Sequence, residues 1–173
     1  FPTGDVATID ADGTLQISLE SVPVPTPGPD DVLIQVQAAP INPSDIGLLL
    51  GPADLSTVQV AGTAERPVAT ARIPERAMPG MAARVGQSMA VGNEGSGLVV
   101  AAGASPAAQA LLGRTVAVIG GAMYTQYRAM PAAQCLVLPQ GTTAAEGASC
   151  FVNPLTALGM VETLRREGHT ALV

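Results

Sequence analysis

Three short segments of this 173-residue chain concentrate the side chains that could take part in chemistry. In order they are 41–45 (INPSD), 91–97 (VGNEGSG) and 151–157 (FVNPLTA). Their carboxamides and hydroxyls can donate and accept hydrogen bonds, which binds and orients a substrate. Asn42, Ser44 and Thr156 carry such groups. Tyr124 is a catalytic candidate, because a phenol can donate a proton.

Each segment also has an ordinary structural interpretation. Asn, Pro, Ser and Asp all favour turns for local backbone reasons, so 42–45 by itself predicts a turn. Gly95 and Gly97 permit a close turn of the backbone. Thr156 could simply face solvent in the first turn of a helix. The residues alone leave both interpretations open.

Taken together and in this order, the three segments resemble the medium-chain dehydrogenase/reductase family, in its zinc-free quinone oxidoreductase or enoyl reductase branch. The resemblance implies a GroES-like catalytic barrel over 1–150, followed over 151–173 by the crossing helix and first strand of an incomplete Rossmann domain. The glycine-rich turn that holds the pyrophosphate, and the residue that selects NAD or NADP, would then lie beyond Val173.

The same resemblance implies hydride transfer from NADPH or NADH to a small electron-poor molecule, such as a quinone or a conjugated enone. It places Asn42 against the nicotinamide or the substrate carbonyl, and Thr156 against the nicotinamide. Ser44 would donate a hydrogen bond to the substrate or to the cofactor ribose. It also implies a homodimer for the full-length protein.

Two positions depart from the zinc-dependent members of the family. Where those members have Cys and His, this chain has Asn42 and Asn93. Catalytic zinc needs three protein ligands and an open position, and neutral carboxamides are poor ligands. Cys150 lies near the region of the third ligand but cannot be placed in register. Gly47 replaces the His of the proton relay. We therefore expect no metal, and an acceptor that is already electron-poor.

Two further residues have alternative roles. Glu94 is either a buried structural carboxylate or an acid, and the sequence favours neither. Enoyl reductases of this branch usually carry a catalytic Tyr shortly after the Asn-Pro-Ser-Asp motif, and 46–54 contains none. Tyr124 is the available substitute, whereas Tyr127 matches a strand tyrosine of the family that mostly packs.

The stretch over 46–90 is longer than in simple quinone reductases. Within it, one interpretation of 73–89 is a surface loop with one short helix, since loops tolerate insertions. The other is a lid over the substrate cleft, in which Arg76 and Arg84 meet an anionic group such as a phosphate of a thioester carrier.

Hydrophobic patterns predict the elements that position these residues. Strands are expected over 32–37, 97–100, 114–119 and 135–138. The proline-rich stretch 22–29 should not pair continuously. Thr143 and Glu146 predict a capping box. Asn153 and Pro154 predict the start of a second helix that ends at Gly168, before a buried strand over 170–173. The expected fold is mainly β, a GroES-like barrel with peripheral helices.

Composition excludes several classes of partner. The formal charge of -6 and the 2% aromatic content argue against nucleic acid. No apolar stretch reaches the roughly 20 residues of a membrane span. The two cysteines, Cys135 and Cys150, form no CxxC pair, which favours a reducing cytoplasm.

Two function classes remain. The first is a zinc-independent NAD(P)H-dependent oxidoreductase, present here as its catalytic part and inactive alone. The second is a stand-alone GroES-like module that serves binding or assembly without catalysis. Zinc-dependent alcohol oxidation is a distant third, because of Asn42 and Asn93. An unpaired strand over 170–173 would in addition predict self-association.

Overall fold

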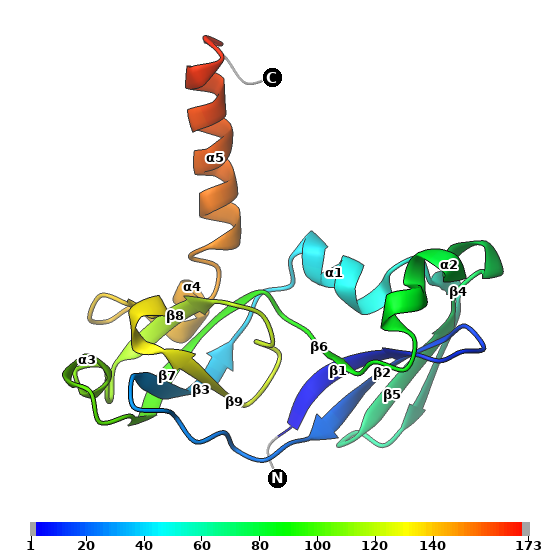
Figure 1. Ribbon diagram of the computed structural model, residues 1–173, viewed down its shortest axis with the longest axis horizontal. Helices are drawn as coiled ribbons and strands as arrows, with labels where there is room; N and C mark the ends of the chain where they lie inside the picture. The colour runs from blue at the N-terminus through cyan, green and yellow to red at the C-terminus, as the bar shows by residue number, and fades with distance from the viewer. Residues whose placement is uncertain (1–2, 171–173) are drawn as a thin grey trace.

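The computed structural model describes residues 3–170, and these form two five-stranded antiparallel sheets (Figure 1). The first sheet, in the order β4-β5-β2-β1-β6, contains β1 (Thr3–Ile9), β2 (Thr14–Ser21), β4 (Asp54–Gly62), β5 (Pro67–Arg72) and β6 (Met89–Ala90). The second, in the order β10-β8-β7-β3-β9, contains β3 (Asp31–Ala38), β7 (Glu94–Ala102), β8 (Thr115–Ile119), β9 (Tyr127–Pro131) and β10 (Leu136–Val137). The expected mainly β, GroES-like architecture is confirmed.

The second sheet has an aliphatic core, as the scarcity of aromatic residues requires. Val32 and Ile34 of β3 are fully buried and pack with Val99, Val116 and other apolar side chains. The strands predicted over 32–37 and 114–119 correspond to β3 and β8. The structure lengthens the strand predicted over 97–100, which begins at Glu94, and shortens the one predicted over 135–138 to two residues.

The first sheet is covered by two of the short helices of the chain. Ile9 and Leu15 lie in its core, with Ala7, Ile73 and Val91. Apolar side chains of α1 (Pro43–Leu50) and α2 (Met78–Met81) pack against this core, including Leu48, Met78 and Met81. Figure 1 shows both helices above this sheet. The remaining short helices are α3 (Pro106–Gln109), α4 (Ala144–Gly147), η1 (Glu75–Ala77), η2 (Ala82–Arg84) and η3 (Ala132–Gln134), the last three being 3₁₀.

The stretch over 46–90 contains more than the surface loop with one short helix that the sequence suggested for 73–89, where α2 and its flanking 3₁₀ turns lie. It contributes the antiparallel pair β4 and β5 to the first sheet, followed by α2 and its flanking 3₁₀ turns. The lid interpretation gains no support from its arginines. Arg84 donates to the carbonyl oxygen of Leu48 at 2.7 Å, and Arg76 is exposed on η1.

Gly95 and Gly97 lie in a strand and not in the expected turn. A Cβ on Gly97 would lie 2.0 Å from the carbonyl oxygen of Gln35, on the neighbouring strand β3. The glycine is therefore required for the close approach of β3 and β7, which also pair with two register shifts. Of the glycines in this motif, Gly92 has the positive φ, +96°.

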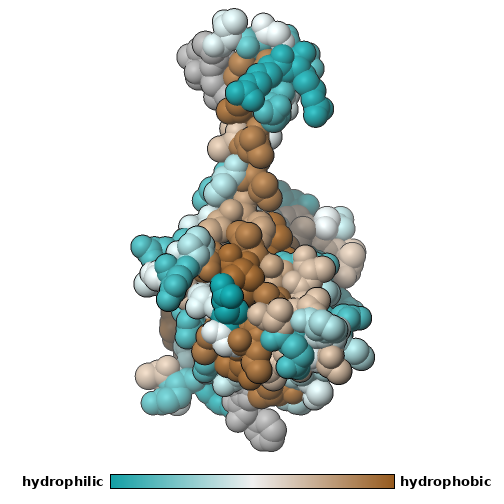
Figure 2. Space-filling view, turned by 90° about the vertical axis from the view of Figure 1, so that its left-hand side faces the viewer, coloured by the Kyte–Doolittle hydropathy of each residue, from teal (hydrophilic) through white to brown (hydrophobic). Residues whose placement is uncertain are grey.

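Helix α5 (Val152–Arg166) leaves the body of the molecule and projects away from both sheets (Figure 1). It ends where predicted, with Gly168 at φ +72°. Figure 2 shows hydrophobic atoms continuing from the body along this helix. Within residues 3–170, no helix is long and apolar enough to cross a membrane. The strand predicted over 170–173 lies, except for Thr170, outside the described residues.

Candidate active site

The first motif forms the N-terminus of helix α1. Asn42 is the N-cap, with φ -91° and ψ 157°, and Pro43 follows with a φ suited to the first helical position. The backbone N–H of Asn42 donates to Oδ2 of Asp45 at 2.9 Å. The carbonyl oxygen of Asn42 in turn accepts from the backbone N–H of Asp45 at 2.9 Å. The predicted turn is therefore the first turn of a helix, in which the carboxylate of Asp45 accepts the hydrogen bond of the backbone N–H of the N-cap residue.

Asp45 also connects the first motif to the second. Its carboxylate is fully buried, and Oδ1 accepts from the backbone N–H of Asn93 at 2.9 Å. Nδ2 of Asn93 donates to Oγ of Ser44 at 2.8 Å. Ser44 is exposed, and no group among residues 3–170 accepts the proton of its hydroxyl. The hydroxyl of Ser44 is thus held by Asn93 and remains able to donate outward.

Glu94 joins all three motifs. Its side chain is fully buried, and Oε1 accepts from Nδ2 of Asn42 at 3.1 Å. Its Oε2 accepts from the backbone N–H groups of Phe151 and Val152, both at 2.9 Å. Three donors thus converge on one carboxylate, which is an acceptor at both oxygens when ionised. This geometry supports the structural interpretation of Glu94, which the sequence left open.

The same contacts explain where helix α5 begins. The first N–H groups of a helix have no partner within it, and a negative charge at this end is favourable. Glu94 supplies both, so α5 starts at Val152 with Phe151 as its N-cap residue. The predicted N-cap, Asn153, is wrong: it lies inside the first turn because a carboxylate from β7 performs the capping.

Asn42 lies deeper than the sequence suggested. Its side chain is 2% exposed, and its amide donates to Glu94. A residue placed in this way orients its neighbours, whereas Ser44 and Thr156 lie at the surface. The side chain of Thr156 donates back to the carbonyl oxygen of Val152 at 2.6 Å, one turn from the groups that Glu94 holds.

Tyr124 belongs to the same region but is held by the main chain. Its hydroxyl donates to the carbonyl oxygen of Pro40 at 2.8 Å, two residues before Asn42. A hollow of about 350 Å³ lies beside this contact and is lined by Ile41, Ala39, Met123 and Tyr124, among others. The structure therefore brings Tyr124 to the loop that carries Asn42, with its ring against an apolar space and its proton donated to Pro40. Tyr127 begins β9, as expected of a strand tyrosine.

The donor set does not fit a catalytic zinc. The side-chain amide nitrogens of Asn42 and Asn93 donate hydrogen bonds to Glu94 and Ser44, respectively. An N–H donor offers no lone pair to a metal ion. Among residues 3–170, no three His, Cys, Asp or Glu side chains come together in a group that could hold a metal ion. Three such ligands are what a catalytic zinc site needs.

Sequence reasoning missed some members of the site. The roles of Asp45 and Asn93 were not predicted, although the spacing of Asn42 and Asp45 is that of a capping box and could have indicated the first. The backbone groups of Phe151 and Val152 carry no signal in the sequence, since their role depends on a carboxylate 57 and 58 residues away.

Comparisons with known proteins found matches among solved structures only: no family model and no curated protein matches the sequence. A protein from Mesorhizobium loti, assigned as an NADPH:quinone reductase, is 26% identical with a TM-score of 0.64. The match covers 96% of this chain and 45% of that protein.

Two other structures have the same fold at lower identity. The JamJ enoyl reductase is 20% identical with a TM-score of 0.62, and the match covers 94% of this chain and 43% of the enzyme. A mycobacterial protein solved in complex with NADPH is 19% identical with a TM-score of 0.60, and the match covers 95% and 42% of the two chains. The present chain thus spans less than half the length of each of these proteins.

Proposed function

We propose that this chain, which has the fold of the medium-chain dehydrogenase/reductase family in its quinone-oxidoreductase-like branch, is the catalytic part of an NAD(P)H-dependent reductase. Its substrate would be a small electron-poor molecule, a quinone or a conjugated enone. Residues 1–150 would form the catalytic domain, and 151–173 would lead into the nucleotide-binding domain. The observation that carries this proposal is the buried carboxylate of Glu94, which joins the Asn42 loop to the start of helix α5.

In this proposal each residue has a defined task. The nicotinamide, when bound, supplies the hydride. Ser44, held by Asn93, donates its O–H to the carbonyl oxygen of the acceptor, where negative charge grows as the hydride arrives. Thr156 lies on α5, so Glu94 fixes its position relative to Ser44 through the start of that helix. Asn42 positions this arrangement from below the surface.

The acceptor would be reduced without the help of a metal ion. Zinc lowers the energy of a negatively charged oxygen as a Lewis acid, and this chain offers carboxamides where a zinc site needs ligands. A quinone or enone accepts hydride with hydrogen-bond polarisation and one proton. The hollow beside Ile41 and Tyr124 is lined largely by apolar side chains, which suits a ring or an alkyl chain.

The test is nucleotide binding and turnover by the intact protein. NADPH and NADH would be titrated by fluorescence, and their oxidation followed with a panel of quinones, enones and simple aldehydes. We expect oxidation with quinones or enones that a zinc chelator does not inhibit. Activity with aldehydes alone, or loss of activity with the chelator, would contradict the proposal.

One observation favours a second candidate, a GroES-like module that binds or assembles without catalysis. Helix α5 exposes Leu155, Leu158 and Met160 by 53%, 55% and 54%, which is a surface for another protein or domain. The nucleotide titration separates the two candidates. Neither binding nor turnover in the intact protein, together with a mass near 17.3 kDa, would favour the binding module.

A further inference from the structure

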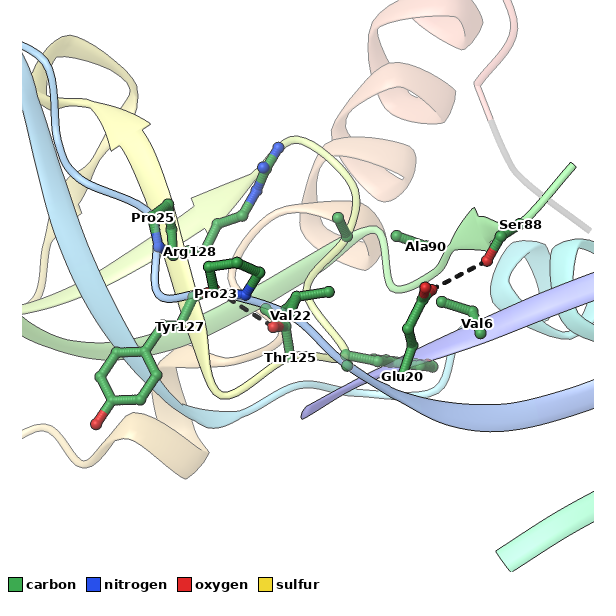
Figure 3. A pocket seen from close by; sticks show the side chains of 13 residues that line it. Val6, Glu20, Val22, Pro23, Pro25, Ser88, Ala90, Thr125, Tyr127 and Arg128 are labelled. Carbon is green, nitrogen blue, oxygen red and sulfur yellow. Dashed lines mark hydrogen bonds between the residues drawn. The ribbon is translucent and has the colours of Figure 1, made fainter. Parts of the chain in front are cut away.

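A second pocket, of about 310 Å³, lies at the seam between the two sheets. It is lined by residues of β1, β2, β6 and β9 and by the unpaired segment after β2, and Figure 3 shows it from close by. Of the candidate active-site residues, Tyr124 lines it, whereas Asn42, Ser44, Glu94 and Thr156 do not. Its volume is that of a site for a small molecule.

The walls of this pocket are mainly apolar. Val22, Pro23 and Pro25 form one wall, and Val6 and Ala90 form another. The prolines have no N–H, so this wall offers few donors to a ligand. An apolar body would lose its contact with water here, which favours burial of a hydrocarbon chain or a ring.

One polar group in the pocket lacks a partner. The Nε of Arg128 is buried, and within residues 3–170 it has no hydrogen-bond acceptor. Buried donors are normally satisfied, and Nε of Arg128 is an exception that it shares with Nε of Arg84, so what Arg128 offers a ligand is the positive charge that it brings to the lining of the pocket. The carboxylate of Glu20 also lines the pocket, and its Oε2 accepts from Oγ of Ser88 at 3.2 Å, which leaves its negative charge in place. Figure 3 shows Glu20 pointing toward Ser88 and standing apart from Arg128.

The backbone at the pocket is strained as well. Ala122, in the loop that lines it, has φ +55°, a conformation that residues with a Cβ rarely adopt. Such strain concentrates at sites with a function, where the surrounding structure holds it. Tyr124 lines both this pocket and the hollow beside Ile41, so the two spaces share one wall.

We propose that this pocket binds a small organic carboxylate with an apolar body, such as a medium-chain fatty acid. The carboxylate pairs with Arg128, whose planar guanidinium matches two oxygens, and the hydrocarbon packs against the proline wall. The site is separate from the proposed reductase chemistry, and its occupant is not the hydride acceptor.

The chain contains its own reporter for this site. It has two tyrosines and no tryptophan, and both Tyr124 and Tyr127 line the pocket. Intrinsic tyrosine fluorescence therefore reports binding, and the variants below assign it to this pocket and not to the hollow that Tyr124 also lines. The probe is octanoate, which does not absorb where tyrosine does, and 1-octanol serves as the uncharged control of the same chain length.

We expect a saturable fluorescence change with octanoate, with a dissociation constant of about 1 mM or below, and binding of 1-octanol weaker by about tenfold. Arg128→Gln should weaken octanoate binding by about tenfold or more, whereas Arg166→Gln, an exposed arginine on α5, should leave it unchanged. Ala90→Leu, which fills the pocket and keeps the charge, should also abolish binding.

Three results would overturn the proposal. Equal binding of octanoate and 1-octanol would mean apolar adsorption only. Equal weakening by Arg128→Gln and Arg166→Gln would mean an effect of overall charge. No saturable change up to about 10 mM octanoate would mean that the pocket binds no such acid. Circular dichroism of each variant checks its fold, and Ala90→Leu keeps the proposal testable if Arg128→Gln does not fold.

Discussion

Two charged side chains lie where elements of this chain meet, and they differ in whether the chain satisfies their hydrogen-bonding groups. Glu94, between β7 and helix α5, receives three hydrogen bonds from the chain itself. Arg128, between the two sheets, keeps a buried N–H that no group in residues 3–170 accepts. A buried group that the chain satisfies holds elements together, whereas one that it leaves unsatisfied is available to a ligand. The two regions should therefore respond differently to substitution.

The largest effect on stability is expected for Glu94→Ala. The change leaves Nδ2 of Asn42 and the N–H groups of Phe151 and Val152 without their acceptor. We expect the free energy of unfolding to fall by about 3 kcal/mol, measured by urea denaturation. The control Glu162→Ala removes an exposed carboxylate paired with Arg165, and should cost no more than about 0.5 kcal/mol. Equal losses in the two variants would contradict the role given to Glu94.

Opening of the start of α5 can be followed at Cys150, the residue before Phe151. In Glu94→Gln only one side-chain oxygen remains as an acceptor, so this end of the helix should open more often. We expect the alkylation rate of Cys150 at about pH 8 to rise by about fivefold.

Cys135 is the internal control for that experiment. Burial raises the pKa of its thiol to about 11, so little of the reactive thiolate exists at about pH 8. Its alkylation should remain slow in both proteins and should increase only as the pH approaches that pKa. A rate for Cys150 that does not change in Glu94→Gln would show that Glu94 does not hold this end of the helix.

A smaller loss is expected for Asp45→Ala. The carboxylate of Asp45 fixes the first turn of α1 by accepting from the backbone N–H groups of Asn42 and Asn93, and the variant removes this acceptor. The cost should be about 2 kcal/mol by the same denaturation assay. Asp30→Ala, an exposed carboxylate on the loop before β3, is the matched control, and we expect a change within about 0.5 kcal/mol. The assignment of Asp45 fails if the two variants unfold alike.

The smallest effect is expected for Arg128→Gln. No hydrogen bond of its Nε is lost, so the free energy of unfolding should change by less than about 0.5 kcal/mol. Arg84→Gln, in contrast, removes the 2.7 Å bond to the carbonyl oxygen of Leu48 and should cost about 1 kcal/mol. A large loss for Arg128→Gln would show that this arginine holds the sheets together, which would weaken its assignment to a ligand.

Local patterns predicted the parts of the fold that depend on neighbours in sequence. The apolar strands β3 and β8 followed from their composition, and the capping box of α4 followed from Thr143 and Glu146, where both predicted contacts are present. The order of the three motifs indicated the fold, and Glu94 brings the three segments together.

Contacts between distant residues were not predictable in the same way. The N-cap assigned to Asn153 was wrong because Glu94 caps α5 from another strand. Gly97 appeared to be a turn residue because the approach of the carbonyl oxygen of Gln35 cannot be read from its neighbours in sequence. The pair of strands β4 and β5 was not predicted, since most of β4 is exposed and shows no regular burial pattern.

Steady-state kinetics of Ser44→Ala in the intact protein test the central claim most directly. Ser44 is placed to donate to the oxygen where charge develops, so kcat/KM for a quinone should fall by about a hundredfold, while the nucleotide dissociation constant stays nearly constant. Ser56→Ala, a surface hydroxyl that contacts Asp54, should retain full activity. A Ser44→Ala variant as active as Ser56→Ala would contradict the claim that these motifs form the site of hydride transfer.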